Sequence, residues 1–185
     1  YAFALVFVQT FALRLSMKKT KAIYAASLDP ITFGHLWVVR QGLELFDELI
    51  VCIAVNPSKV GRYLFSAEER AAMATACVPP GAIVKTIGPN YLVDFIRQEK
   101  ATHLLRGVRN AEDFSVEHTM AEVNRQMANN RGFDVETIMV TPPHELSIVS
   151  SSFVKSLIGY EGWQKEIRQY VPSQIAEALE AKYRK

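Results

Sequence analysis

Four short loops of the sequence carry side chains that could bind phosphate groups. The first runs from Ser27 to His35 and ends in Thr-Phe-Gly-His at an expected helix start. A helix N-terminus offers free backbone N–H groups and a positive dipole, so Gly34 could let a phosphate approach and His35 could donate to it. The alternative is a tight turn with a capping Asp29 and a surface histidine. The Thr-x-Gly-His pattern alone does not decide between the two.

The other three loops add hydroxyl and cationic side chains. Ser150, Ser151 and Ser152 open an expected helix with Lys155 one turn later, although simple N-capping would also explain serines there. The run Arg106-Gly107-Val108-Arg109 carries two guanidinium groups, which suit phosphate oxygens, with surface salt bridges as the alternative. The run Asn56-Pro57-Ser58-Lys59 adds a lysine. Each loop is ordinary alone, but all four at carboxyl ends of strands indicate a phosphate site.

The elements that must position these loops follow from the hydrophobic pattern. Short apolar runs at 22–26, 49–55, 83–87, 102–105 and 135–140 are typical of parallel strands buried on both faces. Helical patterns lie between them, and we predict an α/β fold: a single doubly wound (Rossmann-like) domain with a five-stranded parallel sheet and helices on both faces. Ligands of such sheets bind at the carboxyl ends of the strands, where the strand order reverses.

Three helical segments have specific signals. Ser66 and Glu69 form a capping box that opens a helix running toward Cys77. A long amphipathic helix is expected over 111–129, with Phe114, Thr119, Met120, Val123 and Met127 in reach of one face. A last helix begins after Pro172, and Ile175, Leu179 and Tyr183 are expected to point inward.

Composition excludes several classes of protein. The 185 residues suit one domain, and 49% apolar content is too high for a disordered chain. With 21 basic and 19 acidic residues the net charge is +2, which argues against a nucleic-acid protein with a broad basic surface. The cysteines, Cys52 and Cys77, fit neither a metal site nor a disulfide framework, so a reduced, cytoplasmic protein is expected.

The N-terminal segment is treated apart from the domain. Residues 1–13 are mostly apolar, but they are fewer than the ~20 that a membrane-spanning helix needs. We expect 1–16 to be an extension and 17–185 to be the domain, with no membrane partner. A peripheral membrane anchor is the alternative.

The four loops together resemble the bacterial phosphopantetheine adenylyltransferase family of the nucleotidyltransferase superfamily. The similarity covers roughly Ala22 to Tyr170 in order and with matching spacing. The Thr-x-Gly-His loop marks only the superfamily. The Arg-Gly-x-Arg run with Glu117 eight residues after Arg109 narrows the resemblance to the family.

The resemblance implies an enzyme that transfers AMP from ATP to 4′-phosphopantetheine, giving dephospho-coenzyme A and pyrophosphate, with Mg²⁺. The acceptor phosphate would attack the α-phosphorus directly, without a covalent intermediate. The family also implies a homohexamer, dephospho-coenzyme A or coenzyme A as product or feedback ligand, and no nucleic-acid partner.

The family pattern implies roles for particular residues. His35, Lys59 and Arg106 match catalytic positions, and Ser27, Lys59, Leu92 and Arg106 match positions that bind the acceptor. The ATP-binding positions match Ser27, Leu28, His35, Gly107, Val108, Arg109, Glu117, Leu146, Ser147, Ile148, Val149, Ser150, Ser151 and Ser152.

The sequence departs from the family at the end of the first strand. The family has Pro-Gly before the hydroxyl residue, and this chain has Ala25-Ala26, which would be costly if residue 26 needed a positive φ. Two other functions stay open. One is a nucleotidyltransferase with another acceptor, such as nicotinamide mononucleotide, a polyol phosphate or choline phosphate. The other, which Ala26 suggests, is a nucleotide- or coenzyme A-binding regulator without turnover.

Overall fold

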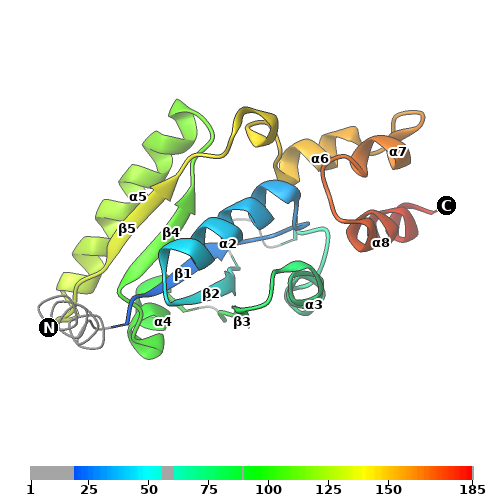
Figure 1. Ribbon diagram of the computed structural model, residues 1–185. Coiled ribbons are helices and arrows are strands. Elements are labelled where there is room, and N and C mark those ends of the chain that lie inside the picture. The colour runs from blue at the N-terminus through cyan, green and yellow to red at the C-terminus, as the bar shows by residue number, and fades with distance from the viewer. Residues whose placement is uncertain (1–18, 56–60, 89, 185) are drawn as a thin grey trace, which may run out of the picture.

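The computed structural model describes residues 19–55, 61–88 and 90–184. Its five strands form one parallel sheet in the order β3-β2-β1-β4-β5 (Figure 1). The strands are β1 (Lys21–Ala26), β2 (Glu48–Ile53), β3 (Ala82–Thr86), β4 (His103–Gly107) and β5 (Glu136–Val140). The predicted five-stranded parallel sheet is confirmed, although β2 ends at Ile53 rather than at Val55 and β4 continues to Gly107 rather than ending at Leu105.

Helices cover both faces of this sheet, as predicted. On one face lie α2 (Phe33–Leu45) and α3 (Ala67–Cys77), and on the other lie α4 (Leu92–Glu99) and α5 (Ala111–Asn129). Alternate residues of β1 serve the two faces: Tyr24 packs into the core beneath α2, while Ile23 and Ala25 pack beneath α4 and α5. Continuously apolar residues suit the central strands β1 and β2, which are buried on both faces. The expectation of burial on both faces is wrong for the edge strands β3 and β5, where Ile83 and Ile138 are exposed.

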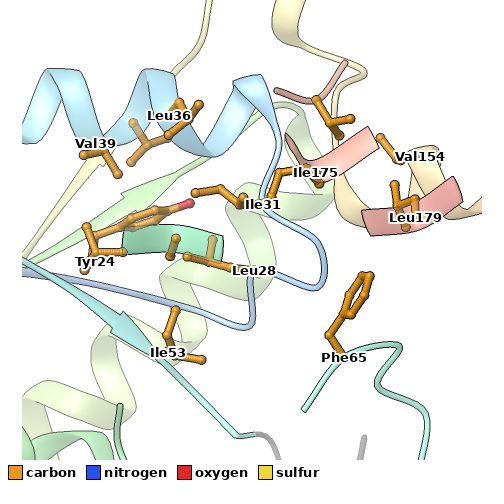
Figure 2. Close-up of a cluster of buried hydrophobic side chains, with 14 of the residues drawn as sticks. Tyr24, Leu28, Ile31, Leu36, Val39, Ile53, Phe65, Val154, Ile175 and Leu179 are labelled. Atoms are coloured by element: carbon orange, nitrogen blue, oxygen red, sulfur yellow. The ribbon is translucent and has the colours of Figure 1, made fainter. Parts of the chain in front are cut away.

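The chain ends in a short 3₁₀ turn and three helices that gather at one end of the sheet (Figure 1). These are η2 (His144–Leu146), α6 (Ser151–Leu157), α7 (Trp163–Ile167) and α8 (Ser173–Tyr183). Leu28 and Ile31, from the loop after β1, share a buried cluster with Ile175 and Leu179 of α8 (Figure 2). The loop that carries Thr-x-Gly-His is thus anchored in the hydrophobic core.

Two of the helix predictions are confirmed closely. The Ser66 hydroxyl accepts from the Glu69 N–H at 3.1 Å, and the Glu69 carboxylate accepts from the Ser66 N–H at 2.7 Å, as a capping box requires. The helix expected over 111–129 has those bounds.

Cys52 is a fully buried core residue, and burial raises the pKa of its thiol to about 12, so the thiol stays protonated and unreactive.

The expected inward position of Tyr183 is wrong, whereas Ile175 and Leu179 are buried as expected. Tyr183 is 45% exposed although its ring meets Trp163 edge-on. Phe114, Met120 and Val123 of α5 also remain exposed, because the sheet beneath α5 contacts other residues of that helix, such as Ala128. A helical apolar pattern predicts a face that needs a partner, but it does not say whether the partner belongs to the same chain.

No helix within 19–55, 61–88 and 90–184 is both long and apolar enough to cross a membrane.

Candidate active site

A pocket of about 230 Å³ opens at the carboxyl ends of β1 and β4, where the strand order reverses. Three of the four predicted loops meet there, and the fourth, Asn56–Lys59, lies outside the described residues. The lining residues are Tyr24, Ala25, Ala26, Ser27, Gly34, His35, Val38, Arg106, Gly107, Arg109, Asp113, Glu117, Pro142, Leu146, Val149, Ser150, Ser151 and Ser152. A serine-rich helix start, an imidazole and two guanidinium groups therefore surround one cavity.

Most of the site residues named from the sequence line this pocket. Those that do are Ser27, His35, Arg106, Gly107, Arg109, Glu117, Leu146, Val149, Ser150, Ser151 and Ser152. Leu28, Val108, Ser147, Ile148 and Leu92 do not: the first two are buried in the core, Ile148 is exposed, and Leu92 begins α4 beyond β3. Leu28 has φ 47°, in the left-handed region, and is fully buried within the apolar cluster of Figure 2.

His35 is held in one tautomer by the residue that caps its own helix. The backbone N–H of Thr32 donates to His35 Nδ1 at 3.1 Å, and the Thr32 hydroxyl lies 2.8 Å from the same nitrogen. Burial, and then the positive charge of Arg109, lowers the pKa of His35 to about 4. The imidazole is therefore neutral near pH 7, with its proton on Nε2. His35 lines the pocket as a hydrogen-bond donor and not as a cation.

Gly34 is required by a close approach between two of the loops. A Cβ at this position would lie 2.7 Å from the carbonyl oxygen of Val149, well inside van der Waals contact. The start of α2 and the segment before α6 therefore pack closely against each other, because residue 34 has no side chain. His35 and Val149 are 114 positions apart in the sequence. This contact explains why the Thr-x-Gly-His loop and the serine run that follows Val149 line one pocket.

The two arginines are oriented by carboxylates of α5. Arg106 Nε donates to Glu117 Oε2 at 2.5 Å, and Arg106 also donates to the backbone carbonyl of Ala25. Arg109 forms a two-pronged pair with Asp113, with N···O distances of 2.7 and 3.0 Å. Each guanidinium carries five N–H donors, so these pairs fix its plane without using every donor.

The serines at the start of α6 form different hydrogen bonds. The Ser150 hydroxyl accepts from the Phe153 N–H at 3.1 Å and is the N-cap of α6, as the simpler alternative proposed. The Ser151 hydroxyl donates to the Pro30 carbonyl at 2.8 Å and joins α6 to the loop after β1. All three serines also line the pocket, so capping and ligand contact are compatible here.

Asp29 has a role that sequence reasoning missed. It does not cap α2: its buried carboxylate accepts from the backbone N–H groups of Leu64 and Phe65 and pairs with Lys155 of α6 at 3.0 Å. One carboxylate thus joins the loop after β1, the segment before α3, and α6. Residues 29 and 155 are far apart in the sequence, and no local pattern in a single sequence indicates that they form an ion pair. Arg109 lies just before Asn110, the N-cap of α5, so its pairing with Asp113 is a contact at the start of the helix and not one between neighbours on a helix face.

Comparisons with known proteins agree with the geometry. Residues 23–157 match the family model described as Cytidylyltransferase-like. The chain is 36% identical over 163 residues to a phosphopantetheine adenylyltransferase of Neisseria meningitidis, covering 88% of this chain and 94% of the relative. It is 40% identical over 160 residues to the enzyme of the same name from Clostridium perfringens, covering 85% and 92%.

A solved structure supports the fold independently. Nicotinic acid mononucleotide adenylyltransferase of Plasmodium falciparum, in complex with APC, matches with a TM-score of 0.64 at 17% identity, covering 90% of this chain and 96% of that one. At such low identity the match bears on the fold alone. The relatives and the family model decide the family, and on their identity and coverage the chain belongs to the phosphopantetheine adenylyltransferase family of cytidylyltransferase-like proteins.

Proposed function

We propose that this protein transfers the adenylyl group from ATP to 4′-phosphopantetheine, which gives dephospho-coenzyme A and pyrophosphate. The observation that carries the proposal is the convergence of His35, Arg106, Arg109 and the α6 serines on one pocket at the switch point of the sheet. These groups donate hydrogen bonds or carry positive charge, as a site for phosphate esters requires. The names of the relatives supply the acceptor.

The reaction is a direct displacement. A 4′-phosphate oxygen forms a bond to the α-phosphorus of ATP while the bond from that phosphorus to the bridging oxygen breaks, and pyrophosphate leaves. Because both the attacking group and the leaving group are anions, positioning and charge stabilisation supply most of the catalysis. His35 donates from Nε2 to the α-phosphate oxygens, and no general base is required.

We assign the other side chains from the positions that the family resemblance implies. Arg109 and Glu117, with Gly107 and the segment 146–152, form the ATP side. Ser27, at the end of β1, lies between the two substrates. Arg106 and Lys59 take the acceptor phosphate, although Lys59 lies outside the described residues. Leu92, at the start of α4, contacts the apolar part of the pantetheine arm.

Mg²⁺ is expected to enter as a complex with ATP. Within the described part of the chain, no three His, Cys, Asp or Glu side chains gather in a metal-binding group. Mg²⁺ usually keeps several waters and takes oxygens from substrate phosphates, so such a group is not needed. The donor-rich pocket suits a triphosphate, and a bound Mg²⁺ would add charge neutralisation. The carboxylates of Asp113 and Glu117 are the pocket groups that could take one of its waters.

We further propose a cytoplasmic homohexamer that binds dephospho-coenzyme A as product and coenzyme A as a related ligand. Exposed apolar side chains on α5, among them Phe114, Val116, Met120 and Val123, support a contact between copies. Light scattering on the purified protein tests the assembly: a mass of six chains supports it, and a monomer contradicts it.

An acceptor panel tests the substrate. Pyrophosphate release is measured with ATP and 4′-phosphopantetheine, pantetheine, nicotinamide mononucleotide or choline phosphate. We expect release with the first alone, since pantetheine lacks the attacking phosphate. Release with nicotinamide mononucleotide or choline phosphate instead would assign a nucleotidyltransferase with a different acceptor. ATP binding without release in any arm would assign a regulator.

A further inference from the structure

Arg70, on α3, is a buried cation that the proposed mechanism does not use. It is 1% exposed, and the described residues provide no carboxylate within ion-pair distance of it. A buried guanidinium without a counter-charge is costly to desolvate, so hydrogen bonds to backbone carbonyls must offset this cost. Its Nε is also buried without a hydrogen-bond partner in the described structure.

The guanidinium reaches the ends of two neighbouring strands. Nη1 donates to the backbone carbonyl of Ser27, which follows β1, and to that of Ala54, which follows β2, at 3.2 Å for the second. Just before this point the Ala54 N–H donates to the Ala26 carbonyl at 2.9 Å. The backbone hydrogen bonds between β1 and β2 end at this Ala54–Ala26 bond. Arg70 therefore joins the two chain segments just after it, because it bonds to the carbonyls of both Ser27 and Ala54. Its guanidinium also lies over the Tyr63 ring, 4.3 Å from the centroid, which fixes its plane.

We propose that Arg70 is a positioning residue that acts through Ser27, a role that rests on the proposed function. Ser27 lines the pocket, and the proposed function puts it between the two substrates. Holding its carbonyl fixes the backbone of Ser27 and hence the direction of its hydroxyl. The residue that follows, Leu28, has a left-handed backbone, so the chain turns sharply at Ser27 and its direction depends on the contacts on either side. Displacement of a positioned group by about 1 Å can cost about 10²-fold in rate.

A double-mutant cycle tests this role. We expect Arg70→Met to lower kcat at least tenfold while KM for ATP changes less than threefold, because the ATP-binding groups of α5 and α6 are untouched. In a Ser27→Ala background, Arg70→Met should lower kcat less than twofold further. Arg70→Lys, which can still donate to one carbonyl, should recover part of the loss. Arg168→Met, at an ion pair between α7 and α8, is the control for the same chemical change.

Equal losses in the two backgrounds, or a normal kcat in Arg70→Met, would overturn the proposal. Hydrogen exchange of the Ala54 amide gives a readout that does not depend on the reaction. Protection of this amide should fall in both Arg70 variants while that of Ile50, within β2, is unchanged, and unchanged protection at Ala54 would also overturn it. If the wild-type protein releases no pyrophosphate, the proposed function fails, and the exchange experiment still decides the role of Arg70.

Discussion

Replacement of His35 by alanine removes one donor from the pocket and one acceptor from the helix cap. The donor is Nε2–H, because Nδ1 already accepts from the Thr32 N–H. Loss of one donor aimed at a developing oxyanion typically costs about 10²–10³-fold in kcat, or about 3–4 kcal/mol. Loss of the acceptor leaves the buried Thr32 N–H without its partner, which costs about 1–3 kcal/mol of unfolding free energy. We therefore expect both a slower and a less stable enzyme.

A second substitution separates the two effects. In His35→Gln the side-chain oxygen can accept from the Thr32 N–H, as glutamine does in a capping box, so stability should largely return. Its amide N–H groups cannot occupy the place of Nε2, so kcat should remain low. Dissociation constants for ATP and 4′-phosphopantetheine should stay within roughly tenfold of the wild type in both variants, because the contact matters most as charge develops.

The pH dependence tests the charge state of His35. Since its pKa is lowered to about 4, the imidazole is neutral at working pH, and the ratio of wild-type to His35→Ala kcat should be constant between about pH 5.5 and 8.5. A ratio that falls as pH rises through about 6.5 would show that an imidazolium is needed and would refute the reasoning. The lowered pKa also affects stability. Between about pH 4 and 6.5 His35 is protonated in the unfolded chain but neutral in the folded one, so its contribution makes the free energy of unfolding rise with pH. His35→Ala should lose this pH dependence.

The assay follows pyrophosphate release at saturating substrates, with thermal and chemical unfolding in parallel. His144→Ala is the matched control, because His144 is exposed and does not line the pocket. A near-normal kcat in His35→Ala would remove this side chain from the chemistry.

Three further changes have defined outcomes. Gly34→Ala forces a Cβ to 2.7 Å from the Val149 carbonyl, so thermal unfolding should occur earlier and titration should show ATP affinity at least tenfold weaker; normal affinity would contradict the close approach. Ala26→Gly should leave ATP affinity unchanged or improved and cost about 0.5–1 kcal/mol in chemical unfolding, since Ala26 lies in a strand without positive φ; a large loss of affinity would contradict this. Deletion of 1–16 should change neither kcat nor melting temperature, because every matched motif follows Ala22, and loss of assembly in this variant would count against that prediction.

The sequence predicted the parts of the molecule that local pattern determines. Apolar runs gave the five strands, and the Ser66–Glu69 capping box and the bounds of α5 follow from side chains three or four residues apart. The loops at the carboxyl ends of strands could be placed together because parallel strands end at one edge of the sheet.

What the sequence could not provide depends on contacts between distant residues. The alternative to a phosphate-binding loop gave Asp29 a capping role, yet its carboxylate pairs with Lys155 across 126 positions. Leu28, which the family resemblance matches to an ATP-binding position, has a left-handed backbone and a side chain buried in the core, and its contact with ATP stays a prediction. Arg70 lies in an ordinary polar helix segment, and only the fold brings it to the Ser27 carbonyl.

The fate of the α-phosphate tests the central claim most directly. ATP labelled with ³²P at the α-position is incubated with the wild-type protein, Mg²⁺ and 4′-phosphopantetheine, and small products and protein are separated. Direct adenylyl transfer predicts that the label appears in dephospho-coenzyme A, mole for mole with pyrophosphate released, and that the protein carries none. Label in free AMP, label bound to protein as an intermediate, or unchanged ATP would contradict the account.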